Sequence, residues 1–184
     1  MRRTFDFDWF KVRWLPRYGW ILDRSPAVVV VPISPDDRVW LAQLERVPTG
    51  TSSWELPGGG VDGNEDIVTA GLRELEEECT LVAKRGRLHP NVLELAPGMG
   101  RFQHYVVIAA DVVPKGRRPV PQREEGIVAI RRFDRPSVRR MLRTGRINVH
   151  ATVAALVVSG WLDGRTAQQR RRSDRARPAN DRPR

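Results

Sequence analysis

The 184-residue sequence has one cysteine and no long hydrophobic run, and each shortage limits the classes of protein to which it can belong. With Cys79 alone, no disulfide framework can form, which is typical of a protein in the reducing cytosol. No apolar stretch reaches the roughly 18 residues of a membrane-spanning helix. The first residues, MRRTFDFDWFKV, also lack the apolar core of a secretory signal. We therefore expect a cytoplasmic protein without a membrane partner.

Histidine is scarce too, since His89, His104 and His150 lie far apart and show no zinc-ligand spacing. Positive charge, by contrast, is concentrated at one end. The net charge is +10, and residues 165–184 contribute +6 of it through eight arginines and two aspartates. This segment lacks the apolar residues needed to fold, so we expect a disordered Arg-rich tail. An arm that contacts nucleic-acid phosphates is the less favoured alternative.

The rest of the sequence alternates between strand and helix patterns. The β-branched run AVVVVPI at 27–33 predicts a strand buried on both faces, with 39–46 as its hairpin partner. Residues 9–23 predict two short strands, and residues 65–79 predict a helix capped by Asn64. More strands and two closing helices follow. The pattern predicts an α/β (α+β) fold with a mixed β-sheet sandwiched between α-helices.

Three segments are expected along the chain. Residues 1–24 would form a short N-terminal antiparallel β segment, residues 25–164 the folded domain, and residues 165–184 the tail. Because 40% of the residues are hydrophobic, the middle segment has enough apolar surface for one core.

The predicted helix carries a crowded acidic segment, RELEEE at 73–78. On a helical wheel, Glu74, Glu77 and Glu78 share one flank beside an apolar stripe, and Arg73 can pair with Glu77 one turn later. Two carboxylates about 4 Å apart repel by roughly 4 kcal/mol at an effective dielectric near 20. Grouped carboxylates suit a hard divalent cation such as Mg²⁺. A solvated acidic helix face is the alternative.

The glycine-rich loop LPGGGVDGNED before the helix favours the metal interpretation, because glycines let backbone groups approach a ligand closely. Residues 59–81 resemble the Nudix box, G-x5-E-x7-R-E-U-x-E-E-x-G-U, where U is aliphatic. The matching residues are Gly59, Glu65, Arg73, Glu74, Leu75, Glu77, Glu78 and Leu81. Thr80 departs from the box, which has glycine there to end the helix in a left-handed conformation. We expect threonine to cost about 1 kcal/mol or to reshape the cap.

The resemblance implies a Nudix hydrolase domain at 25–164 with a metal site on the acidic helix. It implies that Glu74 and Glu78 bind Mg²⁺ directly, and that Mn²⁺ can substitute. Glu77 would be a further or water-mediated ligand, and Gly58 would bind the ion through its carbonyl oxygen.

Three other residues of the motif take supporting roles in this resemblance. Gly59 would approach the substrate, and Arg73 would hold neighbouring carboxylates in place. Glu65 would either join the metal site through water or complement the positive end of the helix dipole. The sequence does not choose between these two roles for Glu65.

A wider resemblance covers residues 22–161. The segments ERVPTGTSSWELPGGGVD and NVHATVAALVV are similar to parts of ADP-ribose pyrophosphatases and related nucleotide-sugar hydrolases. Pro97, 16 residues after Leu81, lies where that subfamily carries a substrate-side proline; an ordinary loop proline is an equal alternative. The implied reaction is Mg-dependent hydrolysis of a nucleoside diphosphate joined to another moiety, and ADP-ribose would give AMP and ribose 5-phosphate.

The same resemblance assigns residues outside the box. In PQREEGIVAI, Glu125 matches the loop carboxylate that acts as general base, with Glu124 as second choice. Glu77 of the acidic helix is the third candidate. Arg46 matches an arginine that faces the substrate phosphates, which a guanidinium binds bidentately. Trp14 and Trp20 are candidates to stack on the adenine base, although core packing is the commoner role of tryptophan.

Two alternative functions stay open. An (8-oxo-)nucleoside triphosphate pyrophosphohydrolase would share the fold, but the SWELPGG lead-in and Pro97 favour a diphosphate substrate. A non-catalytic module that senses ADP-ribose is expected to lose box carboxylates, and none is lost here. The resemblance also implies a homodimer formed through the N-terminal segment.

Overall fold

The computed structural model describes residues 4–7 and 10–164. Residues 1–3, 8–9 and 165–184, and with them the expected Arg-rich tail, lie outside the described residues. The strands are β1 (Thr4–Phe7), β2 (Phe10–Leu15), β3 (Gly19–Arg24), β4 (Ala27–Ile33), β5 (Val39–Arg46), β6 (Thr51–Glu55), β7 (Leu81–Val82), β8 (Arg85–Glu94), β9 (Gln103–Ala110), β10 (Val113–Pro114) and β11 (Ile127–Phe133). The helices are α1 (Ile67–Cys79), the single 3₁₀ turn η1 (Arg123–Glu125), α2 (Arg135–Arg143) and α3 (His150–Val158).

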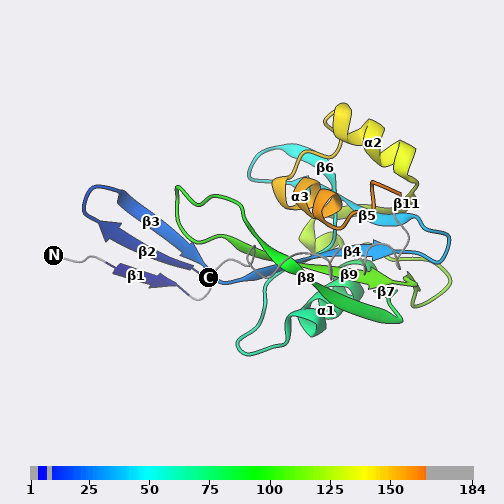
Figure 1. Ribbon diagram of the computed structural model, residues 1–184, viewed down its shortest axis with the longest axis horizontal. Coiled ribbons are helices and arrows are strands. Elements are labelled where there is room, and N and C mark those ends of the chain that lie inside the picture. Colours follow the sequence, from blue (N-terminus) through cyan, green and yellow to red (C-terminus); the bar gives the residue numbers. More distant parts are fainter. Residues whose placement is uncertain (1–3, 8–9, 165–184) are drawn as a thin grey trace, which may run out of the picture.

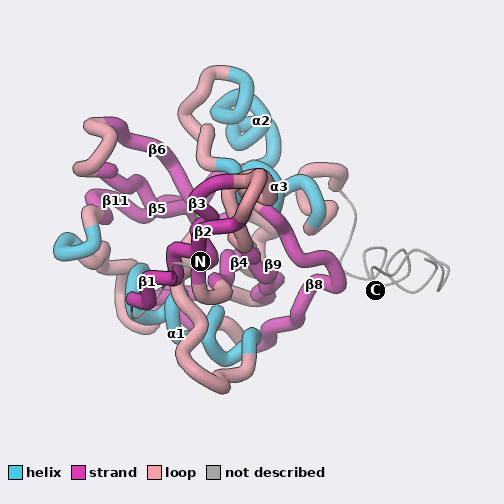
Figure 2. Tube along the Cα trace, turned by 90° about the vertical axis from the view of Figure 1, so that its left-hand side faces the viewer, coloured by secondary structure: helices cyan, strands magenta, loops and turns pink. Residues whose placement is uncertain are grey.

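A six-stranded sheet forms the centre of the molecule. Its order is β11-β5-β4-β9-β8, and β6 pairs with β5. β4 and β9 run parallel while the other pairs are antiparallel, so the sheet is mixed. α1 covers one face, and α2 and α3 lie on the other (Figure 1). Figure 2 shows the same three layers from the side. The predicted mixed sheet between helices is confirmed.

The middle strand β4 explains why both faces need a helical cover. All seven of its residues are buried. Val29 and Val31 pack into one apolar cluster with α2 and α3, whereas Val28 and Val30 pack into a second cluster with α1. Successive side chains of a strand point to opposite faces, so a strand buried on both sides is apolar throughout. The uninterrupted β-branched run is the expected sequence for this position.

A smaller antiparallel sheet of β1, β2 and β3 extends from one side of the body (Figure 1). β2 and β3 are the two predicted strands, whereas the sequence pattern does not predict β1, whose four residues are all exposed. The ring centroids of Phe5 and Trp14 lie 5.7 and 5.4 Å from that of Trp20. These three aromatic side chains are 39–53% exposed.

The start of α1 corrects one prediction. The helix begins at Ile67, two residues after the expected start, and its N-cap is Asp66 rather than Asn64. The Asp66 carboxylate accepts hydrogen bonds from the backbone N–H groups of Val68 and Thr69, both at 3.0 Å. Asp caps a helix as well as Asn does, so the sequence offers two equivalent starts and the structure uses the later one.

No helix in the described part of the chain has both the length and the apolar composition needed to cross a membrane.

Candidate active site

The glycine-rich loop after β6 is held against the central strand. The backbone N–H groups of Val28 and Val30 donate to the carbonyl oxygens of Gly59 and Pro57, at 2.9 and 2.8 Å. Gly58 lies so close to β4 that a Cβ there would be 2.1 Å from the carbonyl oxygen of Val28. Only glycine fits this approach, and it brings the loop backbone alongside α1.

Two glutamates of α1 point at this loop. The backbone N–H of Gly58 donates to Glu78 Oε2 at 2.9 Å. A Cβ at Gly59 would lie 2.5 Å from the Glu74 carboxylate, so the glycine leaves the space that this carboxylate needs. Burial raises the pKa of Glu78 to about 8, and burial also raises the pKa of Glu74. The protein therefore holds two carboxylates where their charged forms are poorly solvated.

Arg73 pairs with three acids of the motif. Its guanidinium donates to Glu65 at 3.1 and 3.2 Å, and to both Glu74 and Glu77 at 2.9 Å. It also donates to the carbonyl oxygen of Gly60 at 3.1 Å. The hydrogen bond from Arg73 is the main reason why the pKa of Glu65 lies below its ordinary value. The predicted Arg73–Glu77 pair is confirmed.

The position of Glu65 removes one of its two predicted roles. Because α1 starts at Ile67, Glu65 lies before the helix, and the first turn contains no acidic residue. A position inside the first turn is therefore wrong for Glu65, whose side chain pairs with Arg73. A water-mediated role at the metal site stays a prediction.

The two candidate base residues lie in η1, directly before β11. Gln122 at its N-cap donates its backbone N–H to the Glu78 carbonyl oxygen at 3.2 Å, which places the turn beside the end of α1. After the larger effect of burial, the negative charge of Glu125 contributes to the raised pKa of Glu74 and Glu78. Glu125 is thus within electrostatic reach of both carboxylates.

The donor set fits a hard divalent cation, although the described residues contain no ready-made group of three metal-binding side chains. Glu78 is 8% exposed, and the hydrogen bond to its carboxylate comes from a backbone N–H rather than a cationic side chain. Glu74 and Glu77 are turned toward Arg73. Clustered carboxylate oxygens with partial burial are the ligands that Mg²⁺ and Mn²⁺ take in proteins.

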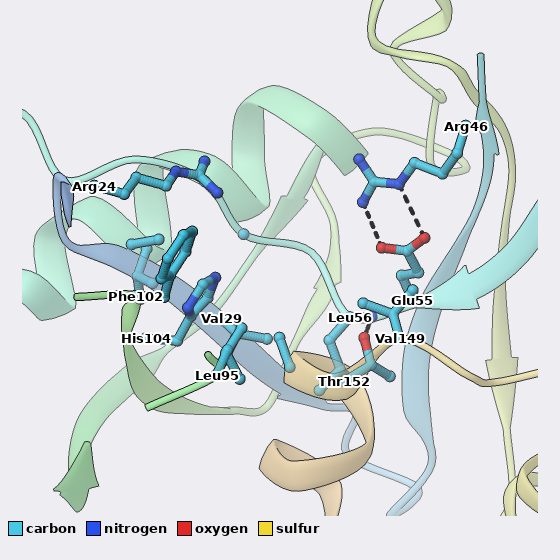
Figure 3. Close-up of a pocket in the computed structure, with 15 residues that line it drawn as sticks. Arg24, Val29, Arg46, Glu55, Leu56, Leu95, Phe102, His104, Val149 and Thr152 are labelled. Atoms are coloured by element: carbon cyan, nitrogen blue, oxygen red, sulfur yellow. Dashed lines mark hydrogen bonds and ion pairs between the residues drawn. The ribbon is translucent and has the colours of Figure 1, made fainter. Parts of the chain in front are cut away.

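A cavity of about 310 Å³ adjoins the carboxylates at Gly58 and Gly59 (Figure 3). Figure 3 shows Arg24 beside Phe102 and His104 on one side of the cavity, and Arg46 on the other. The lining residues are Arg24, Ala27, Val28, Val29, Arg46, Glu55, Leu56, Gly58, Gly59, Leu95, Phe102, His104, Val149, Ala151 and Thr152. One side therefore combines aromatic rings with the Arg24 guanidinium, and the cavity borders the acidic cluster of Glu74, Glu77 and Glu78 at Gly58 and Gly59.

The family assignment follows from the comparison with known proteins. A family model described as NUDIX domain matches residues 23–153. The chain belongs to the NUDIX domain family. A solved structure described as an ADP compounds hydrolase superposes with a TM-score of 0.66 and 23% identity, covering 89% of this chain and 92% of that one. The predicted family and fold are confirmed.

Curated relatives of this Nudix domain have several activities. An RNA pyrophosphohydrolase from Caulobacter vibrioides is 47% identical over 53 residues, 29% of this chain and 30% of that protein. A CMP-5'-(N-acetyl-N-hydroxy-3-aminopropyl)phosphonate hydrolase from Streptomyces rubellomurinus is 28% identical over 148 residues, 79% of this chain and 69% of its own length. An ADP-ribose pyrophosphatase from Saccharomyces cerevisiae is 34% identical over 91 residues, 48% and 39% of the two chains. The chain thus spans about a third of the length of the RNA pyrophosphohydrolases it matches.

In this Nudix domain, Arg46 lines the cavity and is oriented by a buried partner, Glu55. Its Nε donates to Glu55 Oε1 at 3.1 Å and its Nη2 donates to Glu55 Oε2, while Ser53 Oγ donates to Glu55 Oε1 at 2.6 Å. The Glu55 side chain is 4% exposed and that of Arg46 is 49% exposed. Three of the five guanidinium N–H groups stay available to a ligand. Glu55 therefore fixes the direction of Arg46.

Two other predicted substrate residues lie away from this cavity. Neither Trp20 nor Pro97 is among its lining residues. Trp20 lies on the exposed face of the N-terminal sheet, and Pro97 lies in the loop whose Met99 carbonyl oxygen accepts from the Leu22 N–H at 2.9 Å. Their assignment to the substrate stays a prediction.

Sequence reasoning missed Arg24, Phe102, His104 and Thr152. His104 shares a face of β9 with the buried Val106, so alternation gives its side of the sheet but no cavity, and Phe102 lies in the loop before β9. Burial lowers the pKa of His104, so its ring is neutral at pH 7, and its buried Nδ1 has no hydrogen-bond partner within the described residues. Thr152 Oγ1 accepts from the Leu56 N–H at 3.0 Å and joins α3 to the glycine-rich loop.

Proposed function

We propose that the protein hydrolyses the diphosphate bond of a nucleoside diphosphate joined to another moiety, with ADP-ribose as the favoured substrate. The observation that carries the proposal is the shared border at Gly58 and Gly59, where the cavity meets the carboxylates of α1. A nucleoside or sugar in the cavity would leave its diphosphate at this border. At about 310 Å³ the cavity is at the small end of the range for small-molecule sites, which is roughly 300–1,000 Å³.

The acidic cluster would hold Mg²⁺, or Mn²⁺ in its place. Glu74 and Glu78 would bind it directly, with Glu77 and the carbonyl oxygen of Gly58 completing the protein ligands. When bound, the cation neutralises charge on the diphosphate and lowers the pKa of water so that hydroxide is available near neutral pH. Arg73 holds Glu74 and Glu77 close to this position before a cation arrives.

Glu125 would take the proton from the attacking water, and Glu124 and then Glu77 are the alternatives. The supporting observation is that the backbone hydrogen bond from Gln122 to the Glu78 carbonyl oxygen holds η1, which contains Glu125, at the end of α1. A general base within hydrogen-bonding distance of the water is typically worth about 10²- to 10⁴-fold in rate.

Positive charge on the cavity supports an anionic substrate. Arg46 would contact the phosphates, and Arg24 on the opposite side offers a second cation to the same ligand.

The exposed aromatic face of Trp20 and its neighbours supports the predicted homodimer, in which Trp20 would be covered. The homodimer and the cytoplasmic location stay predictions.

A product assay tests the function. The purified chain would be incubated with Mg²⁺ and ADP-ribose, an ADP-sugar, NADH, a diadenosine polyphosphate, 8-oxo-dGTP and 5'-triphosphate RNA. AMP and ribose 5-phosphate from ADP-ribose, lost with EDTA and restored by Mg²⁺, is the expected result. The 5'-triphosphate RNA arm detects the activity by which RNA pyrophosphohydrolase relatives are named, and the 8-oxo-dGTP arm tests the alternative triphosphate substrate. Binding of ADP-ribose without turnover in the presence of Mg²⁺ would instead identify a sensor.

A further inference from the structure

Thr80 departs from the Nudix box and keeps the backbone conformation that the box glycine would adopt. It is the C-cap of α1, in the left-handed region at φ 50° and ψ 39°. A β-branched residue is poorly suited to this region, because its Cβ substituents crowd the backbone. The sequence therefore retains a threonine at a position where glycine would relieve strain. Such a residue has to be explained by what its side chain does.

The Thr80 side chain binds the loop that follows β10. Its hydroxyl oxygen accepts a hydrogen bond from the Val120 backbone N–H at 2.7 Å, and the hydroxyl donates to the Cys79 carbonyl oxygen at 2.7 Å. The Thr80 carbonyl oxygen also accepts from the Lys115 N–H at 2.9 Å. One residue thus holds the loop at two places, five positions apart.

The held loop leads into η1 and ends at Gly126. At its far end, Glu45 of β5 donates its backbone N–H to the Gly126 carbonyl oxygen at 2.9 Å. A Cβ at Gly126 would lie 2.7 Å from the Glu45 carbonyl oxygen, so this end is tightly fitted as well. Most anchors of the loop are backbone groups, which no side-chain substitution removes. Among the described side chains, Lys115 pairs with Glu76 at the start of the loop, and the Thr80 hydroxyl anchors it at Val120, nearer to η1.

We propose that Thr80 is a positioning residue whose hydroxyl fixes the loop at 115–122 on the end of α1 and thereby sets the position of Glu125 in η1 relative to the carboxylates of α1. The proposal rests on the proposed function, in which Glu125 is the general base. The threonine that departs from the box strains the backbone at Thr80, but its hydroxyl supplies a hydrogen bond that anchors the loop. A glycine at this position would free the backbone but leave the Val120 N–H without its acceptor.

Thr80→Gly separates this role from a merely structural one. A structural role predicts that the box glycine keeps or raises the melting temperature and leaves turnover unchanged. We expect an unchanged or higher melting temperature together with a kcat about tenfold lower, because a small displacement of a catalytic group costs rate strongly. KM is expected to stay within about twofold, since the substrate contacts are intact. Thr80→Ser keeps the hydroxyl and should restore kcat.

Thr144→Gly is the matched control. Thr144 is the C-cap threonine of α2, and its hydroxyl donates to the Arg140 carbonyl oxygen at 3.0 Å. Its φ of −96° lies outside the left-handed region, so glycine relieves no strain there. This variant loses the same side chain at a helix end remote from the acidic cluster. It should lower the melting temperature slightly and leave kcat unchanged.

Amide hydrogen exchange, followed by NMR, gives a readout that does not depend on activity. In Thr80→Gly the Val120 and Glu125 amides should exchange at least about tenfold faster than in wild type, and Thr80→Ser should restore both. Unchanged exchange at either amide, or faster exchange with an unchanged kcat, would overturn the proposal. If wild type hydrolyses no diphosphate substrate, the proposed function fails on its own, and the two amides alone decide whether Thr80 sets the position of Glu125.

Discussion

Glu78→Gln tests the acidic cluster through the pH dependence of metal-free stability. Burial raises the pKa of Glu78 from its ordinary 4.5 to about 8, so the folded chain binds this proton more tightly than the unfolded chain does. Near pH 4 Glu78 is mostly protonated in both the folded and the unfolded chain, so its ionisation does not lower the free energy of unfolding. As the pH rises from about 4.5 to 8, only the unfolded state releases its proton, so the free energy of unfolding falls.

The size of the effect follows from the pKa shift. Each pKa unit is worth about 1.4 kcal/mol, which sets an upper bound near 5 kcal/mol. Relaxation around the charged carboxylate and water entry reduce this, and we expect about 2–4 kcal/mol. Gln stays neutral at every pH and keeps an oxygen for the Gly58 N–H. The variant should therefore match wild type at pH 4.5 and be more stable by this amount at pH 8.5.

Urea unfolding of chelated protein at several pH values measures the difference. Glu76→Gln is the control, because Glu76 lies on the opposite flank of α1, pairs with Lys115, and is partly exposed. Its effect should stay below about 1 kcal/mol and show little pH dependence. Mg²⁺ should stabilise wild type at pH 8.5 and leave Glu78→Gln nearly unchanged. If the stability difference between Glu78→Gln and wild type is the same at pH 4.5 and 8.5, the assignment of Glu78 as a buried, poorly solvated carboxylate is wrong.

Three kinetic predictions follow from the same site. Glu125→Gln should lower kcat by about 10²- to 10⁴-fold with little change in KM, whereas Glu124→Gln should be milder; the reverse order would move the base by one residue. Arg46→Lys keeps the charge but loses the paired contact with Glu55, so KM should rise about tenfold and stability should fall by about 1 kcal/mol, and an unchanged KM would remove Arg46 from the substrate. Hydrolysis in H₂¹⁸O should label the AMP phosphate alone, as mass spectrometry would show; label in ribose 5-phosphate would mean attack on the other phosphorus.

The element types could be predicted from the sequence because they depend on local periodicity. β4 is buried on both faces, and the run AVVVVPI has no polar interruption. α1 places Leu75 and Cys79 in the core, as the helical wheel predicts. The start of α1 could not be fixed in this way, since Asn64 and Asp66 both cap helices and their competition is decided by contacts around the loop.

The cavity could not be predicted because no local pattern encodes it. Arg24, Phe102 and Thr152 come from β3, the loop before β9, and α3, which are distant in the sequence. Their meeting depends on how three layers and a loop assemble. The acidic site could be predicted from the sequence, because Glu74, Glu77 and Glu78 lie on one helix and the loop that faces them is adjacent in the sequence. A motif confined to one loop and helix can be recognised before the fold is known.

The four glutamates of RELEEE differ in what balances their charge. Glu74 and Glu77 pair with Arg73, and Glu76 on the opposite flank pairs with Lys115. Glu78 is the most buried of the four, yet the hydrogen bond to its carboxylate comes from a backbone N–H. Burial raises the pKa of Glu78 to about 8. Its charged form is therefore poorly stabilised by the protein, at the point where the glycine-rich loop and the cavity meet. A divalent cation at that point would lower the pKa of Glu78 and let the carboxylate stay charged at neutral pH.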